Sequence, residues 1–151
     1  MTSERPHVII AGYGIGGRFV TECLRKSDIP FVLVEKNPQT VRTQAELGLS
    51  VIEGDITDSE VLRRAGIERA SILALAISDE EASIRASAAA HAIRPEVHII
   101  AATRYTSSGL KALQAGADEI IVAEQAVARE FHRRIETWMT QHGLGPAARG
   151  Y

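Results

Sequence analysis

The chain contains very little cysteine and few aromatic residues. Cys23 is the single cysteine in 151 residues, and Phe, Trp and Tyr together make up 5% of the sequence. One cysteine cannot form an internal disulfide, so the chain is not a small secreted domain held together by disulfides. This cysteine usage suits a reducing, cytoplasmic environment.

Long apolar runs and an excess of charge of one sign are also missing. Apolar stretches such as residues 72–77 fall far short of the roughly 20 residues that are needed to cross a bilayer. The first residues do not resemble a secretory signal. The formal charge is −2, and no basic stripe or polybasic tail is present. We therefore expect a soluble cytoplasmic domain that neither binds nucleic acid nor inserts into a membrane.

The sequence alternates short apolar runs, rich in β-branched residues, with stretches of helical spacing. The expected strands cover residues 7–11, 31–35, 50–54, 71–75, 97–101 and 118–122. The expected helices cover residues 15–26, 38–48, 58–65, 79–93 and 106–115. Because the strand runs are almost continuously apolar, they suit a parallel sheet that is covered on both faces. Residues 1–123 are thus predicted to form an α/β fold, a Rossmann-like doubly wound six-stranded parallel sheet.

An additional C-terminal helix is expected over residues 124–142, outside this alternation. Its apolar residues follow one helical face and are Val127, Phe131, Ile135, Trp138 and Met139. Two interpretations stay open: the helix packs on its own sheet, or it crosses over to a partner subunit. Residues 143–151 are expected to form a flexible tail.

Glycines are concentrated between the first expected strand and the first expected helix. Gly12, Gly14 and Gly17 form a GxGxxG pattern in this context, which is typical of a dinucleotide-binding loop. In such a loop the first glycine permits a tight turn, the second lets a pyrophosphate approach the backbone, and the third lets helix and strand pack closely. The helix N-terminus then offers N–H groups to the phosphates. The candidate phosphate-binding residues are Gly12, Tyr13, Gly14, Ile15, Gly16 and Gly17.

Glu35 ends the second expected strand, eighteen residues after Gly17. An acidic residue at this place accepts hydrogen bonds from the ribose hydroxyls of a bound nucleotide. A carboxylate also repels a 2′-phosphate, which favours NAD or a simple adenine nucleotide over NADP, although Lys36 weakens this exclusion. The alternative is that Glu35 is only a solvated charge at the end of a strand.

Two other strand ends are expected at the same crevice. Asp55 and Ile56 follow the third strand, and Ala76, Ile77 and Ser78 follow the fourth. Ligands of open α/β sheets bind outside the carboxyl ends of the strands, at the point where the strand order reverses. Asp55 could equally be a turn or N-cap residue before the next helix.

Residues that would carry out chemistry on the nucleotide are missing from the pattern. Tyr105 has no lysine four residues later, and neither a GxSxG elbow nor a P-loop lysine occurs. The five histidines show no metal-binding spacing. Only about 29 residues follow the last expected strand, too few for a substrate domain. We expect a nucleotide-binding protein without catalytic residues and without a metal site; the alternative is a small NAD-dependent oxidoreductase or the cofactor-binding half of one.

Several ordered stretches resemble a known family, the regulator of K⁺ conductance (RCK) or TrkA-N domain. They are VIIAGYGIGG, IPFVLVEKNP, GLSVIEGDITDSEVLRRAGIERA and HIIAATRYTSSGLKALQAGADEIIVAE. The likeness covers residues 7 to about 135. ALAISDEEAS and RPEVHIIAATRY are most similar to the cytosolic domains of cation:proton antiporter-2 transporters, the glutathione-regulated K⁺ efflux type included.

This resemblance implies a cytosolic sensor that binds NAD(H), AMP, ADP or ATP. By the same resemblance the sensor forms a homodimer and transmits a nucleotide-dependent change in shape to a K⁺ channel or antiporter, at the inner face of the cell membrane. Residues 12–17 would hold the phosphates, Glu35 the ribose, and Asp55 with Ile56 the adenine side. Residues 76–78 would close the pocket.

The chain departs from many family members at two positions. Ile15 and Ala102 stand where many members have arginine. Both differences remove positive charge near the phosphates, and a triphosphate gains most from such charge. We therefore expect NAD or AMP to bind more tightly than ATP.

The helix at residues 79–93 bears a face of small residues, namely Ala82, Ala86, Ala89, Ala90 and Ile93. The flanking residues Ser83, Ile84, Ser87 and Ala88 are also mostly small. We expect this face to contact a partner subunit, and burial against the sheet is the alternative. A further hypothesis is that the chain serves another protein, with the Trp138 helix as its docking face.

Overall fold

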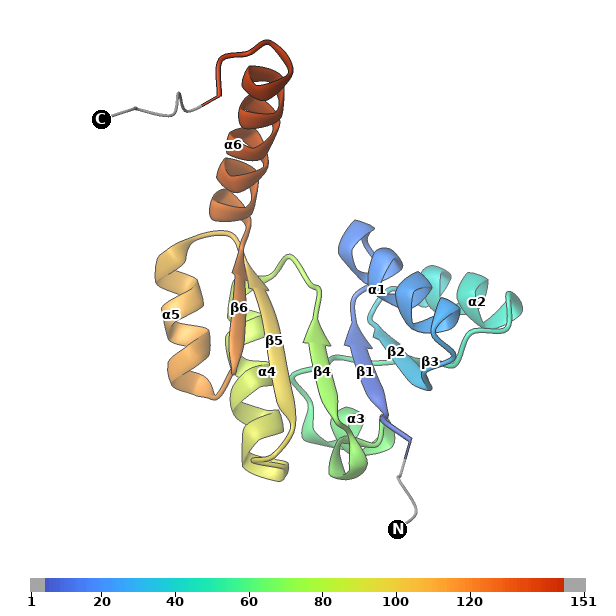
Figure 1. Ribbon diagram of the computed structural model, residues 1–151. Coiled ribbons are helices and arrows are strands. Elements are labelled where there is room, and N and C mark those ends of the chain that lie inside the picture. Colours follow the sequence, from blue (N-terminus) through green and yellow to red (C-terminus); the bar gives the residue numbers. More distant parts are fainter. Residues whose placement is uncertain (1–4, 146–151) are drawn as a thin grey trace.

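The computed structural model describes residues 5–145, which form one parallel sheet with helices on both sides and one projecting helix (Figure 1). The strands are β1 (Val8–Ala11), β2 (Phe31–Glu35), β3 (Val51–Glu53), β4 (Ile72–Leu75), β5 (His98–Thr103) and β6 (Glu119–Val122). The helices are α1 (Ile15–Lys26), α2 (Pro38–Glu46), α3 (Ser59–Arg64), the 3-10 turn η1 (Ile67–Arg69), α4 (Glu80–Ile93), α5 (Thr106–Ala115) and α6 (Ala123–Gln141). The predicted fold class is confirmed.

The sheet has the order β3-β2-β1-β4-β5-β6, and every pair of neighbours is parallel. Ala11, the last residue of β1, lies opposite Val34 of β2 and Leu75 of β4. The chain moves outward from β1 to β3 and then returns to β4, so the strand order reverses between β1 and β4. Connections that leave these two strands diverge, which opens a crevice at their carboxyl ends.

Local signals explain where several helices begin and end. Asn37, Asp58 and Asp79 are the N-caps of α2, α3 and α4, and each side chain accepts a backbone N–H of the first turn. Gly116, with φ of 126°, follows α5 in a backbone conformation that side chains disfavour.

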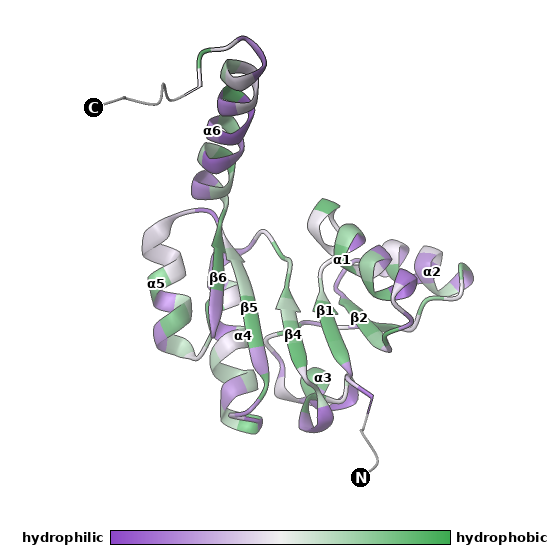
Figure 2. Ribbon diagram, viewed as in Figure 1, coloured by the Kyte–Doolittle hydropathy of each residue, from purple (hydrophilic) through white to green (hydrophobic). Residues whose placement is uncertain are grey.

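The core has two parts, one on each face of the sheet. The larger part lies between the sheet and α3, α4 and α5, and it includes the fully buried Leu73 and Ile99. The smaller part, with Val8, Ile10 and Leu33, lies under α1 and α2. Figure 2 shows the apolar strands in the centre of the molecule.

The small-residue face of α4 packs against other elements of the same chain. Ala86 and Ala90 are fully buried with Ser83 and Ser87, because α4 packs against β5 and α5. The expectation that this face contacts a partner subunit is therefore wrong, and burial against the sheet is correct.

Helix α6 projects away from the sheet. It begins at Ala123, directly after the last residue of β6, and so continues in the direction of the strand (Figure 1). In the part of the chain that the structure describes, no residue of α6 is buried. The predicted apolar stripe exists, but Val127, Phe131, Ile135 and Trp138 are 54–66% exposed. Packing of α6 on its own sheet, one of the two interpretations, is wrong.

One half of one sheet face consequently has no helix over it among residues 5–145. Helices α1 and α2 cover β1, β2 and β3 on this face, whereas β4, β5 and β6 are covered only on the opposite face, by α4 and α5 (Figure 1). The apolar side chains on the uncovered half belong to Ile72, Ala74, Ile100, Ala102 and Ile121, and we call these five residues the open sheet face. The exposed pair of His98 and Glu119 lies beside them on the same side of the sheet. Ile121 is 53% exposed.

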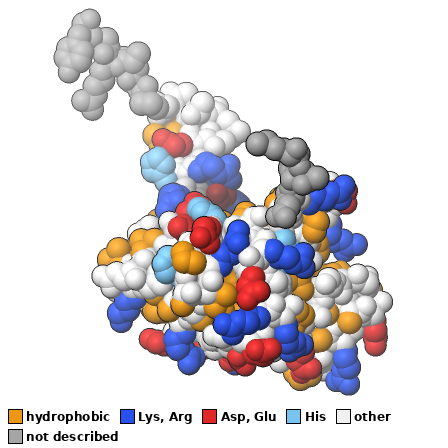
Figure 3. Space-filling model, turned by 90° about the horizontal axis from the view of Figure 1, so that it is seen from below, with side chains coloured by type: hydrophobic (Ala, Val, Ile, Leu, Met, Phe, Trp, Pro, Cys, Tyr) orange, Lys and Arg blue, Asp and Glu red, His pale blue; other side chains and the backbone are white. Residues whose placement is uncertain are grey.

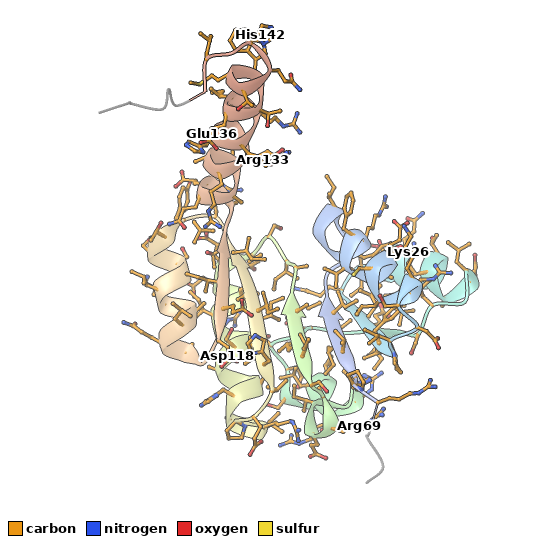
Figure 4. The ribbon with its side chains drawn as sticks, viewed as in Figure 1. Lys26, Arg69, Asp118, Arg133, Glu136 and His142 are labelled. Atoms are coloured by element: carbon orange, nitrogen blue, oxygen red, sulfur yellow. The ribbon has the colours of Figure 1, made fainter. Side chains whose placement is uncertain are left out.

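The polar side of α6 carries ion pairs. Arg133 and Arg134 hydrogen-bond to Glu130 and lower the pKa of its carboxyl group to about 2. Arg133, Glu136 and His142 extend from α6 far from the sheet (Figure 4).

The expected tail begins with a helix-terminating turn. Gly143 has φ of 69°, and the Leu144 N–H donates to the Met139 carbonyl. The rest of the expected tail, residues 146–151, lies outside the described residues. Within the described part of the chain, none of the helices combines the length and the apolar character that a membrane span requires.

Candidate functional site

A cavity of about 830 Å³ begins at the carboxyl ends of β1, β2, β3 and β4 and extends over the neighbouring face of the sheet. Of the predicted site residues, it is lined by Gly12, Tyr13, Gly14, Ile15, Gly16, Glu35, Lys36, Asp55, Ile56, Ala76, Ile77 and Ser78. Gly17 is the exception, because it is buried beneath the loop. The opposite edge of the sheet, at the amino ends of the strands, carries interspersed charges of both signs (Figure 3).

The glycine loop depends on two close backbone contacts. Gly12 has φ of 91°, and a Cβ atom at this position would lie 2.6 Å from the Ala76 carbonyl oxygen. A Cβ at Gly17 would lie 1.9 Å from the Gly12 carbonyl oxygen. The tight turn predicted for Gly12 is confirmed. Gly17 is expected to let α1 pack closely on the strand, but the atom nearest to its missing side chain is the Gly12 carbonyl oxygen of the loop.

Gly14 differs from these two glycines. A Cβ at Gly14 would have nothing within 4 Å, because this residue faces the cavity. Gly14 is also the N-cap of α1, and it has no side chain that could accept an N–H group of the first turn. The first N–H groups of a helix have no intrahelical partner, so the start of α1 can receive an anion in this space.

Glu35 connects the end of β2 to the glycine loop. Its Oε2 accepts the Tyr13 N–H and its Oε1 accepts the Asn37 N–H, both at 3.0 Å. Glu35 is therefore more than a solvated charge. Each carboxylate oxygen has a second lone pair, so two hydroxyl groups of a ligand could still donate to this side chain.

Asp55 forms the turn that the sequence offered as one of its two roles. Its Oδ1 accepts the hydroxyl and the N–H of Thr57, at 2.7 and 2.9 Å. The Thr57 hydroxyl is the main cause that lowers the pKa of the Asp55 carboxyl, and Lys36 adds to it. Lys36 Nζ lies 3.6 Å from Asp55 Oδ2, which joins the ends of β2 and β3 at the cavity wall. Asp58, not Asp55, is the N-cap of α3.

The charges around the cavity are mostly negative. The charged lining residues are Glu35, Asp55, Asp79 and Lys36. Ile15 and Ala102, the two positions expected to lower the positive charge near the phosphates, both line the cavity as well. The lining thus carries one cation, which already pairs with Asp55.

Sequence reasoning missed the apolar side of this cavity. The cavity continues past the glycine loop to Val20 and Leu24 of α1 and across the open sheet face. This side exists because α6 turns away from the sheet. One signal could have revealed it: the expected strand at 118–122 and the expected helix at 124–142 leave only residue 123 for a turn that would bring the helix back.

Within residues 5–145, no three His, Cys, Asp or Glu side chains are grouped so that they could hold a metal ion. His7 is buried, and its Nε2 lies 2.8 Å from the Ala65 carbonyl oxygen. The absence of a metal site stays a prediction.

The TrkA-N domain family matches residues 8–123. The chain belongs to this family. The glutathione-regulated potassium-efflux system protein KefC of Cronobacter sakazakii is 33% identical over 113 residues, which are 75% of this chain and 18% of KefC. Potassium channel protein 1 of Methanocaldococcus jannaschii is 31% identical over 117 residues, which are 76% of this chain and 35% of that protein. This TrkA-N domain thus spans about a third or less of the length of these relatives.

Solved structures share the fold. The TrkA-N domain of the inner membrane protein YbaL from Escherichia coli has a TM-score of 0.84 at 28% identity and covers 89% of this chain and 100% of its own. GsuK bound to ADP has a TM-score of 0.76 at 25% identity, over 90% of this chain and 35% of its own. A Kef C-terminal domain from Shewanella denitrificans in AMP-bound form has the same fold, with a TM-score of 0.71 at 22% identity, over 91% of this chain and 92% of its own.

The two glycine environments predict opposite outcomes for alanine substitutions. Gly17→Ala places a methyl group against the Gly12 carbonyl and should lower the free energy of unfolding by about 2 kcal/mol or more. Gly14→Ala enters empty space and should cost less than about 1 kcal/mol, the difference between glycine and alanine at an N-cap. Urea unfolding followed by circular dichroism measures both values. Equal losses in the two variants would contradict the loop geometry.

Proposed function

We propose that this chain binds NAD(H) or an adenine nucleotide (AMP, ADP or ATP) and is a non-catalytic regulatory domain for K⁺ transport. The observation that carries the proposal is the convergence of the glycine loop, Glu35 and Asp55 on one cavity at the reversal of the strand order. The ADP-bound relative GsuK, at 25% identity, supports this class of ligand.

Each part of the cavity suits one part of the nucleotide. The start of α1, at residues 14–16, would hold the phosphates. Glu35 would accept the ribose hydroxyls with its remaining lone pairs, and it would repel the 2′-phosphate of NADP. Asp55 and Ile56 would lie on the adenine side, and residues 76–78 would close the pocket.

Two substitutions at the cavity should weaken nucleotide binding without unfolding the chain. Glu35→Ala removes a charged acceptor of the ribose, which should cost about 1.5–3 kcal/mol, or about 10- to 150-fold in the Kd for AMP. Gly14→Val fills the space that we assign to the phosphates and should abolish binding. Titration calorimetry measures both. Glu53→Ala is the matched control, because Glu53 lies opposite Glu35 on the neighbouring strand and is exposed.

Unchanged affinity of the Gly14→Val and Glu35→Ala variants for NAD, AMP, ADP and ATP would place the binding site elsewhere. Equal weakening by Glu53→Ala would mean that general destabilisation, instead of a lost contact, explains the result.

NAD or AMP is the preferred ligand in this proposal, because the cavity has few cations for a triphosphate. Ile15→Arg or Ala102→Arg should therefore improve the affinity for ATP by about tenfold and improve that for AMP less. Calorimetry with both nucleotides checks this ranking. Tighter binding of ATP than of NAD and AMP by the unaltered chain would contradict it.

Regulation would act on a K⁺ channel or cation:proton antiporter, at the inner face of the cell membrane. KefC and potassium channel protein 1, which are much longer than this chain, support this kind of partner. A nucleotide can shift such a domain only through unequal affinity for two arrangements of the protein.

We also propose that the chain binds a second copy of itself. The open sheet face and the stripe of Val127, Phe131, Ile135 and Trp138 are both apolar and uncovered among residues 5–145. Surfaces of this kind mark protein interfaces. Since α6 follows β6 without a connecting turn, it points away from its own open sheet face. Reciprocal docking of α6 on the open sheet face of a partner would cover both surfaces in a twofold dimer.

The dimer predicts that one charge on the apolar stripe disrupts association. Phe131→Asp should give a monomer in light scattering, whereas the unaltered chain should have the mass of a dimer. Thr137→Asp is the matched control, because Thr137 is an exposed polar residue of the same helix. A monomeric unaltered chain at high concentration, with and without nucleotide, would remove this part of the proposal.

A further inference from the structure

A carboxylate of another helix binds the start of α5 and the two residues before it. Tyr105, the N-cap residue of α5, makes no capping hydrogen bond with its side chain. Instead, Glu80 Oε1 accepts the N–H groups of Arg104 and Tyr105, and Glu80 Oε2 accepts the Ser108 hydroxyl at 2.6 Å. Glu80 is the first residue of α4, 24–28 positions away in sequence from these donors. One carboxylate therefore ties together the first turns of two helices.

On one side of this carboxylate lies the cavity. Ser78 and Asp79, which directly precede Glu80, line it, and so does Ala82 in the first turn of α4. Asp79 Oδ1 accepts the Ala82 N–H and fixes this turn. A ligand that moves the loop at residues 76–79 would consequently move the start of α4 and Glu80 with it.

On the other side lies the first turn of α6, which begins at Ala123. The Arg104 carbonyl accepts the Glu124 N–H at 3.4 Å, and Thr106 Oγ1 accepts the Gln125 side-chain amide at 3.0 Å. Residues 104–106 therefore contact both helices. Their N–H groups at Arg104 and Tyr105 donate to Glu80 of α4, whereas the Arg104 carbonyl and the Thr106 hydroxyl accept hydrogen bonds from the first turn of α6. No residue of α6 is buried, so few other contacts fix the direction of this helix.

The hydrogen bonds to Glu80 suit a charged carboxylate. The Ser108 hydroxyl is the main cause that lowers the pKa of Glu80, and the Arg104 and Tyr105 N–H groups act in the same direction. The side chain therefore stays an acceptor for all three donors at neutral pH.

From these contacts we infer that Glu80 is a positioning residue. When a ligand binds in the cavity, Glu80 transmits the resulting structural change to the first turn of α6. The inference rests on the proposed function, because it needs a ligand in the cavity. It adds the route: the ligand acts on residues 76–79, Glu80 shifts with α4, and residues 104–106 carry the shift to Glu124 and Gln125. Loss of Glu80 should separate binding from the response of α6.

Hydrogen exchange read by mass spectrometry tests this, with and without saturating AMP. In the unaltered chain, AMP should slow exchange in the glycine loop and change it at residues 123–128 by about threefold or more. In Glu80→Ala the loop should still be protected and the Kd for AMP should stay within about threefold, while the change at residues 123–128 disappears. Glu80→Gln retains an acceptor oxygen for the two N–H groups and should keep most of that change.

Glu81→Ala is the matched control, since Glu81 is an exposed acid in the same first turn. It should behave like the unaltered chain. An undiminished AMP effect at residues 123–128 in Glu80→Ala would overturn the inference and leave the proposed function intact. An AMP effect in the unaltered chain that is confined to the glycine loop would overturn it too. Absence of nucleotide binding by the unaltered chain in calorimetry would overturn both.

Discussion

The arrangement of the site depends on the approach of Gly17 to the carbonyl of Gly12. A side chain at Gly17 would collide with that oxygen at 1.9 Å, so only glycine lets α1 begin this close to the end of β1. The same turn directs the start of α1 at the cavity and places the Tyr13 N–H within reach of Glu35. The loop and the acidic strand end are therefore one hydrogen-bonded unit before any ligand arrives, which reduces the ordering that binding requires.

The cavity at the glycine loop and the open sheet face form one continuous surface. Ile100, Ala102 and Ile121 belong to the open sheet face and also line the cavity. In the proposed dimer, a partner helix on this face would lie next to the bound nucleotide. Ligand and partner would then share side chains, which is a direct physical basis for unequal affinity of the ligand for two arrangements of the dimer.

The sequence predicted what local signals determine. Six apolar runs gave the strands within two residues, and the helical spacing placed the starts of α1 to α5 within one residue. The glycine loop after β1 and Glu35 at the end of β2 located the cavity because β1 and β2 are adjacent parallel strands. Most of what the sequence missed depends on contacts distant in sequence. The burial of the small face of α4 and the hydrogen bonds from the Arg104 and Tyr105 N–H groups to Glu80 follow from packing between elements, which periodicity does not encode. The direction of α6 follows from the absence of a turn after β6.

The central claim is that an adenine nucleotide lies between the glycine loop and Glu35. A crystal structure of this chain grown with AMP tests it most directly. The account predicts the phosphate within hydrogen-bonding distance of the backbone N–H groups at residues 14–16 and a ribose hydroxyl on the Glu35 carboxylate. AMP bound at another place on the molecule, or in this cavity with its ribose away from Glu35, would contradict it.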